Sequence, residues 1–431
     1  MPRIKPFDGY LVAPERAEQV VSPAYDAVSP EMRREFAEAN AHNYLNCMRL
    51  REDFPADAQP SAEQLLALNK ANLEERLADG SFNRLTQPCL FLYRLTLGAH
   101  RQTGVVCEVS VDEYHHGRLR KHESTRSDKE DLLTAYQQVV GVSSSPICLA
   151  YPRDDEIAAA IAEHVRQPPQ LDFTSADGVA QQVWCIEDGA AQRRLQDLFA
   201  RIDITYLTDG HHRAASGWRY AQMMRGDGDR NDDNDDDGDD KRNGDRNRDD
   251  EDAPYNQLLV VLFCADELVL LPFHRAVRDL NGLDETQLAD ALARDFAVQR
   301  MPDGATFEPT RHGEFAMLVN DRWYRLALND GLVDADDPVE SLDVSILQNH
   351  ILAPILGIAD MRSDPRLDYV SGVLGNDGLR RKCAEGWAVC FACFATSIEQ
   401  LMTVADAGAL MPPKSTYFDP KARSGIFVRR K

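Results

Sequence analysis

The chain has 431 residues, a formal net charge of −23 and 43% hydrophobic residues, so it is long enough for two or three domains, each with an apolar core. The acidic balance disfavours binding to nucleic acid, because a phosphate backbone selects for clustered lysine and arginine. The longest apolar runs are much shorter than the about 20 residues that span a bilayer, and the N-terminus lacks a signal-peptide pattern, so we expect a cytoplasmic protein without membrane contact.

Strand and helix patterns alternate over the first half of the chain. Runs of β-branched and aromatic residues predict strands at 91–97, 103–111, 145–151 and 182–188. Apolar residues at helical spacing predict helices at 61–80, 129–140 and 189–202, the first with a serine start and a glycine stop. These patterns indicate a mixed α+β protein.

The segment "TYLTDGHHRAASGW", Thr205 to Trp218, carries the densest set of reactive side chains. We expect a strand through Leu207, a tight loop over 208–212 and a helix that begins near Arg213. Backbone N–H groups at the start of a helix favour a phosphate, and Gly210 lets the backbone approach it closely. Arg213 could then bind phosphate oxygens through two N–H groups at once.

Asp209 and the paired histidines of this segment have several interpretations. Beside a bound phosphate, Asp209 would be a natural partner for Mg²⁺. His211 and His212 alone do not predict a zinc site, because adjacent side chains diverge and further ligands are missing. An ordinary helix cap, in which Asp209 accepts backbone hydrogen bonds and the histidines face solvent, fits the pattern equally well.

An acidic segment, residues 226–253, interrupts the chain directly after this motif. From 226 to 252 it holds 14 acidic and 5 basic residues and no aliphatic or aromatic side chain, so we expect a disordered insert. Asp233, Asp235, Asp237 and Gly238 match the first half of a calcium loop. The twelfth position is Gly244 instead of glutamate, which argues against an EF-hand and leaves only weak attraction of divalent ions.

Beyond the insert, the sequence predicts two strands within 255–277 around a turn at 265–267, helices within 284–296 and 341–357, and strands at 313–320 and 322–328. Nine cysteines without a pairing rhythm indicate reduced, mostly buried thiols. Cys390 and Cys393 form a CxxC inside the apolar run "AVCFACFAT", which favours a core strand over a zinc site.

The run "DGHHRAASGW" resembles the Gly-x-x-Arg-x-x-small nucleotide-binding turn of the ParB and sulfiredoxin-like superfamily, and most closely the "DGHHR" turn of free serine kinases. The resemblance places Gly210, Arg213 and Ser216 on that turn. In those kinases a glutamate in an upstream "HEE"-like motif is the base. Glu123, which follows His122 in "RLRKHESTRSDKEDLL", matches it here.

The chain also resembles, over nearly its whole length, a large bacterial and archaeal family of unknown function. The matching runs extend from "IKPFDGYLVAPE" and "VVSPAYDAVS" through "HEST", "SSPICLAY", "DGHHRAA" and "LLPFHRAV" to "MPPKSTYFDPKARSG". Together the two resemblances imply an N-terminal α+β region at 1–112, a ParB/sulfiredoxin-like core at 113–225, the acidic insert at 226–253 and a C-terminal α+β region at 254–431.

The resemblance implies a Mg²⁺-dependent phosphotransferase that moves a phosphoryl group from ATP or ADP to a small hydroxyl substrate, with serine as the first guess. Phosphoryl transfer needs positioning and charge neutralisation. Glu123 would be the base, Asp209 the metal partner and the Gly210 to His212 amides the phosphate cradle with Arg213. His212 could steer a proton, and His122 would position the substrate. The ordinary alternative for Glu123 is an exposed carboxylate at a helix start, with Ser127 as the N-cap.

Further groups are candidate substrate ligands, although each is equally compatible with a surface salt bridge or a capped turn. They are Thr125 in the "HEST" run, His274 and Arg275 in "LPFHRAV", and Lys414, Ser415 and Thr416 in "MPPKSTYF". Placement in the family also suggests that Tyr25 and Asp26 contribute to one wall of the pocket.

Two rival functions remain open on the sequence. A non-catalytic protein that binds a nucleotide or phospho-metabolite would keep the same turn. A ParB-like DNA-associated switch is disfavoured by the acidic composition. No Walker loop, kinase glycine-rich loop or GxSxG motif is present, and the oligomeric state is open.

Overall fold

The computed structural model describes residues 3–25, 28–226 and 252–431. The chain divides into two compact units, one formed by Met1–Leu268 with Pro420–Lys431 and the other by Val269–Asp419. The boundaries expected at 112/113 and 225/226 both lie inside the first unit, and the expected C-terminal region contributes to both units.

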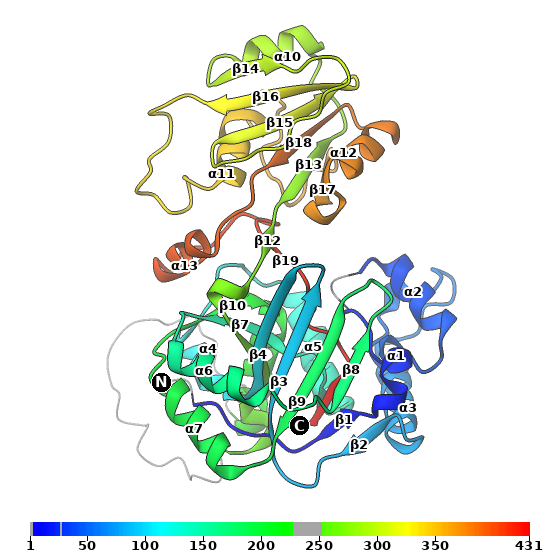
Figure 1. Ribbon diagram of the computed structural model, residues 1–431. Helices are drawn as coiled ribbons and strands as arrows, with labels where there is room; N and C mark the ends of the chain where they lie inside the picture. Colours follow the sequence, from blue (N-terminus) through cyan, green and yellow to red (C-terminus); the bar gives the residue numbers. More distant parts are fainter. Residues whose placement is uncertain (1–2, 26–27, 227–251) are drawn as a thin grey trace. The chain divides into compact units, whose positions relative to one another are not determined.

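The first unit is built on an eight-stranded mixed sheet in the order β5-β10-β7-β11-β4-β3-β9-β8 (Figure 1). Strand β10 is parallel to β5, and β11 is parallel to β7, while the other neighbours are antiparallel. The expected α+β class is therefore confirmed. The strands are β3 (Leu90–Leu97), β4 (His100–Ser110), β5 (Leu119–Arg120), β7 (Ile147–Tyr151), β8 (Leu171–Thr174), β9 (Ala180–Ile186), β10 (Thr205–Asp209) and β11 (Gln257–Cys264).

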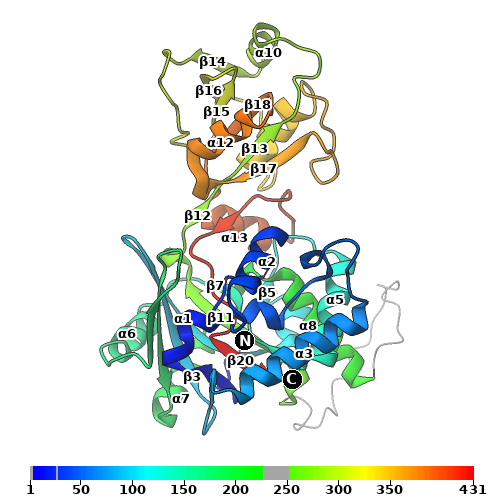
Figure 2. The ribbon, with the colours of Figure 1, turned by 90° about the vertical axis from the view of Figure 1, so that its right-hand side faces the viewer.

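Both faces of this sheet are buried, each in its own apolar cluster. Successive side chains of a strand point to opposite faces, so each central strand contributes to both clusters. On β4, Val105 and Cys107 join one apolar cluster and Val106 joins the other. The cluster that contains Val105 includes side chains of α6 and α7, and the cluster that contains Val106 includes side chains of α3, α5 and β20. Figure 2 shows these two groups of elements on opposite sides of the sheet.

The helices of the first unit are α1 (Ala17–Val20), α2 (Pro30–Ala39), α3 (Ala62–Ala78), α4 (Val111–His115), α5 (Ser127–Val139), α6 (Asp155–His164), α7 (Gly189–Phe199) and α8 (His211–Arg225). Local sequence explains several starts: the side chains of Ser61, Asp154 and Asp188 accept backbone N–H groups and cap α3, α6 and α7. The chain end returns to this unit, where β20 (Phe427–Arg430) lies between β1 (Tyr10–Val12) and β6 (Val142–Ser143) in a small sheet completed by β2 (Phe82–Arg84).

The second unit contains a six-stranded antiparallel sheet in the order β14-β16-β15-β18-β13-β17. Its strands are β13 (Phe273–Val277), β14 (Phe296–Arg300), β15 (Glu314–Val319), β16 (Arg322–Leu328), β17 (Leu367–Ser371) and β18 (Val389–Cys393). Its helices are α10 (Glu285–Leu292), α11 (Asp343–Leu347), α12 (Gly375–Ala384) and α13 (Ile398–Asp406), and β12 (Leu270–Leu271) pairs with β19 (Tyr417–Phe418). Every residue of β18 is buried, which confirms that Cys390 and Cys393 belong to a core strand.

All nine cysteines are unpaired thiols, and most of them are buried, as expected. In the described parts of the chain, no helix is long and apolar enough to cross a membrane. The calcium-like pattern and most of the acidic insert fall within 227–251, outside the described residues.

Candidate functional site

Strand β10 leads into helix α8 through a single glycine. The strand runs to Asp209 and the helix begins at His211, so the loop expected over 208–212 is wrong. Gly210 alone makes the connection, with a φ of +97° that side chains disfavour. A Cβ atom at this position would lie 3.0 Å from Cζ of Arg213, which folds back over the glycine. The resemblance to a glycine-dependent turn therefore has a direct steric basis.

Gly210 occupies the N-cap position of α8, and within the described residues no side chain caps this helix start. The cap hypothesis for Asp209 is wrong: its carboxylate contacts cations instead of backbone amides. An α-helix supplies no acceptor within itself for the amide hydrogens of its first turn. The peptide dipoles add positive potential at this end, so the first turn of α8 presents donors suited to an anion.

Asp209 lies between two cationic side chains. Lys421 Nζ is 2.5 Å from Asp209 Oδ1, and the Arg213 guanidinium contacts Oδ2. Burial alone would raise the pKa of Asp209, but the attraction of Lys421 and Arg213 holds it well below the ordinary value. Both carboxylate oxygens already meet positive charge, so Asp209 does not fit as a Mg²⁺ ligand unless one cation moves away.

Arg213 also holds the segment before β7. Its Nη1 donates to the backbone carbonyl oxygens of Ser145, at 3.0 Å, and Pro146, at 2.6 Å. Together with the Asp209 contact, these bonds turn both terminal nitrogens toward the protein. In this structure the terminal nitrogens of Arg213 therefore bind protein acceptors, whereas the sequence predicted that they bind a phosphate.

The segment that contains Glu123 meets the start of α8. Glu123 Oε2 lies 3.8 Å from His211 Nδ1, and the backbone N–H of Arg126 donates to His212 Nε2 at 3.1 Å. His212 therefore docks the 123–126 segment onto the helix. Glu123 keeps about half of its side chain exposed, with 48% accessible, so the carboxylate can reach a ligand from solvent.

The start of α5 next to this segment differs from the expected cap. Helix α5 begins at Ser127 itself, and its N-cap residue, Arg126, makes no side-chain cap, so the proposed Ser127 cap is wrong. Thr125, a predicted substrate ligand, donates its hydroxyl to Glu130. Glu130 in turn pairs with Arg219 of α8 at 3.4 Å, which ties α5 to α8.

Two buried histidines lie beside Glu123. The rings of His122 and His211 meet edge to face, with centroids 4.5 Å apart. Burial lowers the pKa of His122 to about 4, although a hydrogen bond to the backbone of Leu207 opposes this shift. Burial and the neighbouring His122 lower the pKa of His211 well below its ordinary value. Both rings are therefore neutral near pH 7. Within the described residues, His211 Nε2 is buried and has no hydrogen-bond partner.

These three residues offer the donor set of a metal site. Ligand atoms of His122, Glu123 and His211 all lie within 4.8 Å of one another. Two neutral imidazoles and one carboxylate suit a transition ion such as Mn²⁺ or Zn²⁺ better than Mg²⁺, which prefers oxygen ligands. The sequence placed the metal partner at Asp209 and set aside a zinc site at His211 and His212; it did not bring His122 and Glu123 to His211 as joint ligands.

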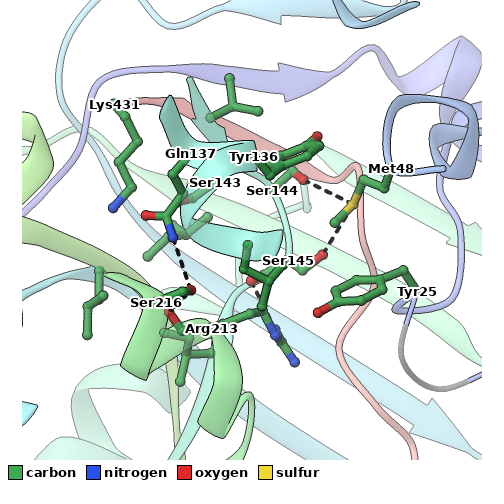
Figure 3. A pocket seen from close by; sticks show the side chains of 15 residues that line it. Tyr25, Met48, Tyr136, Gln137, Ser143, Ser144, Ser145, Arg213, Ser216 and Lys431 are labelled. Atoms are coloured by element: carbon green, nitrogen blue, oxygen red, sulfur yellow. Dashed lines mark hydrogen bonds between the residues drawn. The ribbon is translucent and has the colours of Figure 1, made fainter. Parts of the chain in front are cut away.

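A small cavity of about 50 Å³ has Arg213 in its lining (Figure 3). It is lined by Tyr25, Met48, Leu133, Tyr136, Gln137, Val142, Ser143, Ser144, Ser145, Ile147, Arg213, Ser216, Leu258, Leu259 and Lys431. Gln137 donates to Ser216 at 3.1 Å, while its buried Oε1 has no partner among the described residues. The volume suits a few water molecules and not a nucleotide. Asp26, which the sequence placed near Tyr25, lies outside the described residues.

The remaining predicted ligands belong to the second unit. Arg275 is fully buried and donates to the carbonyl oxygens of Phe273, Pro413 and Lys414. His274 Nδ1 accepts the backbone N–H of Cys393 at 3.3 Å, and Ser415 donates to the Pro412 carbonyl at 2.6 Å. The structure thus gathers His274, Arg275 and the 413–415 turn, with Thr416 directly before β19, and gives their polar groups structural partners.

Lys421 is the site residue that sequence reasoning missed. It stands in the run "MPPKSTYFDPKARSG", from which only Lys414, Ser415 and Thr416 were selected. The chain returns to the first unit at Pro420, and the Lys421 ammonium then reaches Asp209. A basic residue in a run typical of the family was the available signal, but no local pattern could pair it with Asp209.

The first unit thus defines an α+β protein with an uncapped helix start beside a glutamate and two neutral histidines. A family profile described as "Protein of unknown function (DUF1015)" matches residues 4–345. The chain belongs to this family. No curated protein shows significant sequence similarity to it.

Several solved structures are similar to this chain at low sequence identity. A free serine kinase in complex with AMP is 12% identical, with 73% of this chain and 86% of that chain covered at a TM-score of 0.34. A mutant of a free serine kinase in complex with ADP is 14% identical, with 73% and 87% covered at a TM-score of 0.35. A conserved hypothetical protein from Pyrococcus furiosus is 13% identical, with 75% and 95% covered at a TM-score of 0.34.

Proposed function

We propose that this chain binds ATP or ADP at the start of α8 and transfers a phosphoryl group to a small hydroxyl compound, with free L-serine as the first acceptor and O-phosphoserine as the product. The observation that carries this proposal is the meeting of Glu123 with the first turn of α8, where its carboxylate lies 3.8 Å from His211. A carboxylate beside an anion-binding helix start supplies the two groups that phosphoryl transfer needs most.

The amides of His211 and His212 would hold the oxygens of the transferred phosphoryl group. The acceptor oxygen attacks phosphorus, the bond between phosphorus and the leaving nucleotide oxygen breaks, and the hydroxyl proton passes to Glu123. Glu123 is exposed enough to meet an acceptor from solvent. His212 would act as a positioning residue, because its Nε2 holds the backbone of the 123–126 segment.

Burial keeps the neighbouring rings of His122 and His211 neutral, so neither ring adds positive charge beside Glu123. A proton-accepting carboxylate is most useful when no strong cation holds its negative charge. Lys421 and Arg213 neutralise the carboxylate of Asp209, which makes Asp209 a weak proton acceptor. We therefore assign proton transfer to Glu123. Asp209 would hold the turn at Gly210 in place through Lys421 and Arg213.

Mg²⁺ would enter with the nucleotide and neutralise phosphate charge. Asp209 could coordinate it only by exchanging Lys421 or Arg213 for the ion, so no step of this proposal depends on Mg²⁺ bound to Asp209.

A second candidate is a protein that binds a nucleotide or phospho-metabolite without catalysis. The engagement of both Arg213 terminal nitrogens by protein groups favours it, since a phosphotransferase gains from an arginine on the transferring phosphate. The two candidates share the anion site and differ in whether chemistry follows binding.

The deciding experiment incubates the purified chain with Mg²⁺, L-serine and either ³²P-labelled ATP or ³²P-labelled ADP, and separates the products to detect phosphoserine. Labelled phosphoserine with either donor supports the phosphotransferase. Saturable nucleotide binding with no labelled product from serine or from a panel of small hydroxyl compounds supports the second candidate. Absence of both binding and transfer would reject the site.

A further inference from the structure

A second cluster of metal-ligand side chains lies at one end of the eight-stranded sheet, where β3 and β9 run side by side (Figure 1). Leu90 pairs with Ile186 in this ladder, so the same register carries Cys89 to the position opposite Glu187. Cys185 and Glu187 share one face because they stand two positions apart on an extended chain. Directly opposite residues also share a face, so Cys89 joins them.

The register brings the three ligand groups close together. The thiol sulfurs of Cys89 and Cys185 and a carboxylate oxygen of Glu187 all lie within 4.8 Å of one another. Cys185 Sγ is 4.0 Å from Glu187 Oε1. Ligands bound at about 2.3 Å around a tetrahedral ion are separated by somewhat under 4 Å, so small side-chain movements would complete the geometry.

Burial is graded across the cluster. Cys89 is buried at 1% exposure, Cys185 is half-buried and Glu187 is exposed. An ion bound here would have a protein side, formed by the thiols, and an open side, where Glu187 and solvent meet it. Three protein ligands with one open position are a common zinc arrangement.

The charges around the cluster also favour a cation. In the described parts of the chain, Glu187 takes part in no ion pair with lysine or arginine. The carboxylate of Glu187 adds negative charge beside both thiols, within 4.8 Å of the sulfurs. A bound divalent cation would stabilise both thiolates.

We propose that Cys89, Cys185 and Glu187 bind a thiophilic divalent metal ion, Zn²⁺ in the first place, with water at the fourth position. Binding replaces the two S–H protons by two metal–sulfur bonds, so two protons leave for each ion bound. Mg²⁺ and Ca²⁺ do not suit the site, because they require oxygen ligands. The ion would tie the end of β9 to the start of β3, and it is separate from the site proposed for nucleotide.

The test uses Co²⁺ as a spectroscopic probe on the full chain, after reduction and removal of metal by a chelator. The expected result is one thiolate-bound Co²⁺ per chain, with near-ultraviolet thiolate-to-cobalt absorption that Zn²⁺ abolishes by competition; Co²⁺ at His122, Glu123 and His211 would add no thiolate absorption. Cys185→Ser should remove that absorption, and Glu187→Gln should weaken binding about tenfold without removing it. Circular dichroism verifies that both variants fold.

The matched control is Cys383→Ser in the second unit. Cys383 and Cys390 form another close thiol pair, with sulfurs 3.6 Å apart, but among the described residues that pair does not belong to a group of three metal ligands. This variant should bind Co²⁺ like the unmodified chain. The proposal is overturned if Co²⁺ gives no thiolate absorption, if the absorption survives Cys185→Ser, or if Cys89 and Cys185 form a disulfide in the freshly isolated chain.

Discussion

Glu123 and His211 come from distant parts of the sequence, yet Glu123 Oε2 lies 3.8 Å from His211 Nδ1 at the start of α8. The contact is reinforced by the hydrogen bond from the Arg126 backbone to His212, which joins residues 86 positions apart. It places one exposed carboxylate beside the positive end of a helix and next to two neutral imidazoles. The predictions below follow from this arrangement and from the turn that supports it.

Glu123→Gln should separate binding from chemistry. The substitution keeps the size of the side chain but removes its capacity to accept a proton, so phosphoryl transfer should fall by about 10² to 10⁴-fold. Nucleotide affinity should change less than about threefold, because the helix amides remain. Calorimetry with ADP and the phosphoserine assay measure the two quantities. Glu38→Gln, on an exposed position of α2, is the control and should alter neither.

Gly210→Ala should weaken both stability and nucleotide binding. The alanine would have to adopt the positive φ of this position, and its Cβ would lie 3.0 Å from Arg213 Cζ. Gly226, at the other end of α8, also has a positive φ, but among the described residues no atom beyond its chain neighbours and the adjacent helix backbone lies within 4 Å of a Cβ placed there. Gly226→Ala should therefore cost only the conformational penalty of roughly 1 kcal/mol in free energy of unfolding.

Denaturant unfolding and ADP titration compare the two glycine variants. We expect Gly210→Ala to lose more stability than Gly226→Ala and to bind ADP more weakly than the unmodified chain. Gly226→Ala should bind ADP with unchanged affinity. Equal effects of the two substitutions on both quantities would show that the contact between Gly210 and Arg213 is unimportant.

The buried imidazole of His122 should make the free energy of unfolding depend on pH. Its pKa is about 4 in the folded chain and 6.5 as an ordinary histidine. Between these values the unfolded chain binds the proton and the folded chain does not, so stability falls as pH decreases from 6.5 toward 4. The loss at the acidic end is roughly 3 kcal/mol from this group. In the His122→Asn variant, the free energy of unfolding should depend less on pH between 4 and 6.5. The same pH dependence in the variant and the unmodified chain would contradict the assignment of this effect to the buried His122.

Asp209 and Lys421 should be energetically coupled. The ammonium and carboxylate are 2.5 Å apart, and only 21% and 14% of the two side chains are exposed, so removing either partner leaves a largely buried charge. A double-mutant cycle with Asp209→Asn and Lys421→Met should give a coupling free energy of about 1 to 3 kcal/mol in denaturant unfolding. A coupling free energy of zero would mean that the contact of Lys421 with Asp209 does not stabilise the turn.

Much of the fold could be predicted from the sequence because its signals are local. Ser61 with Gln64 marks the start of α3, and the apolar runs of β3, β4 and β11 identify central strands. The boundary of β10 was missed because the polar residues Thr208 and Asp209 look like loop residues. Their strand conformation depends on pairing with β7, which the sequence does not show.

For the candidate site, the sequence selected residues that the structure brings together, but it did not predict their contacts. Gly210 and Glu123 were identified by resemblance to kinase motifs, but Arg213 was expected to face a phosphate and instead binds Asp209 and two carbonyl groups. Lys421 reaches Asp209 only because the chain returns to the first unit after Asp419. Such long-range pairings depend on the tertiary fold, and no spacing rule encodes them.

The most direct test of the phosphate site is a crystal structure of the chain with ADP bound. The account predicts terminal phosphate oxygens within about 3 Å of the amide nitrogens of His211 and His212, with the Glu123 carboxylate facing the terminal phosphorus. Phosphates bound elsewhere on the chain, with the first turn of α8 left in contact with solvent, would contradict it.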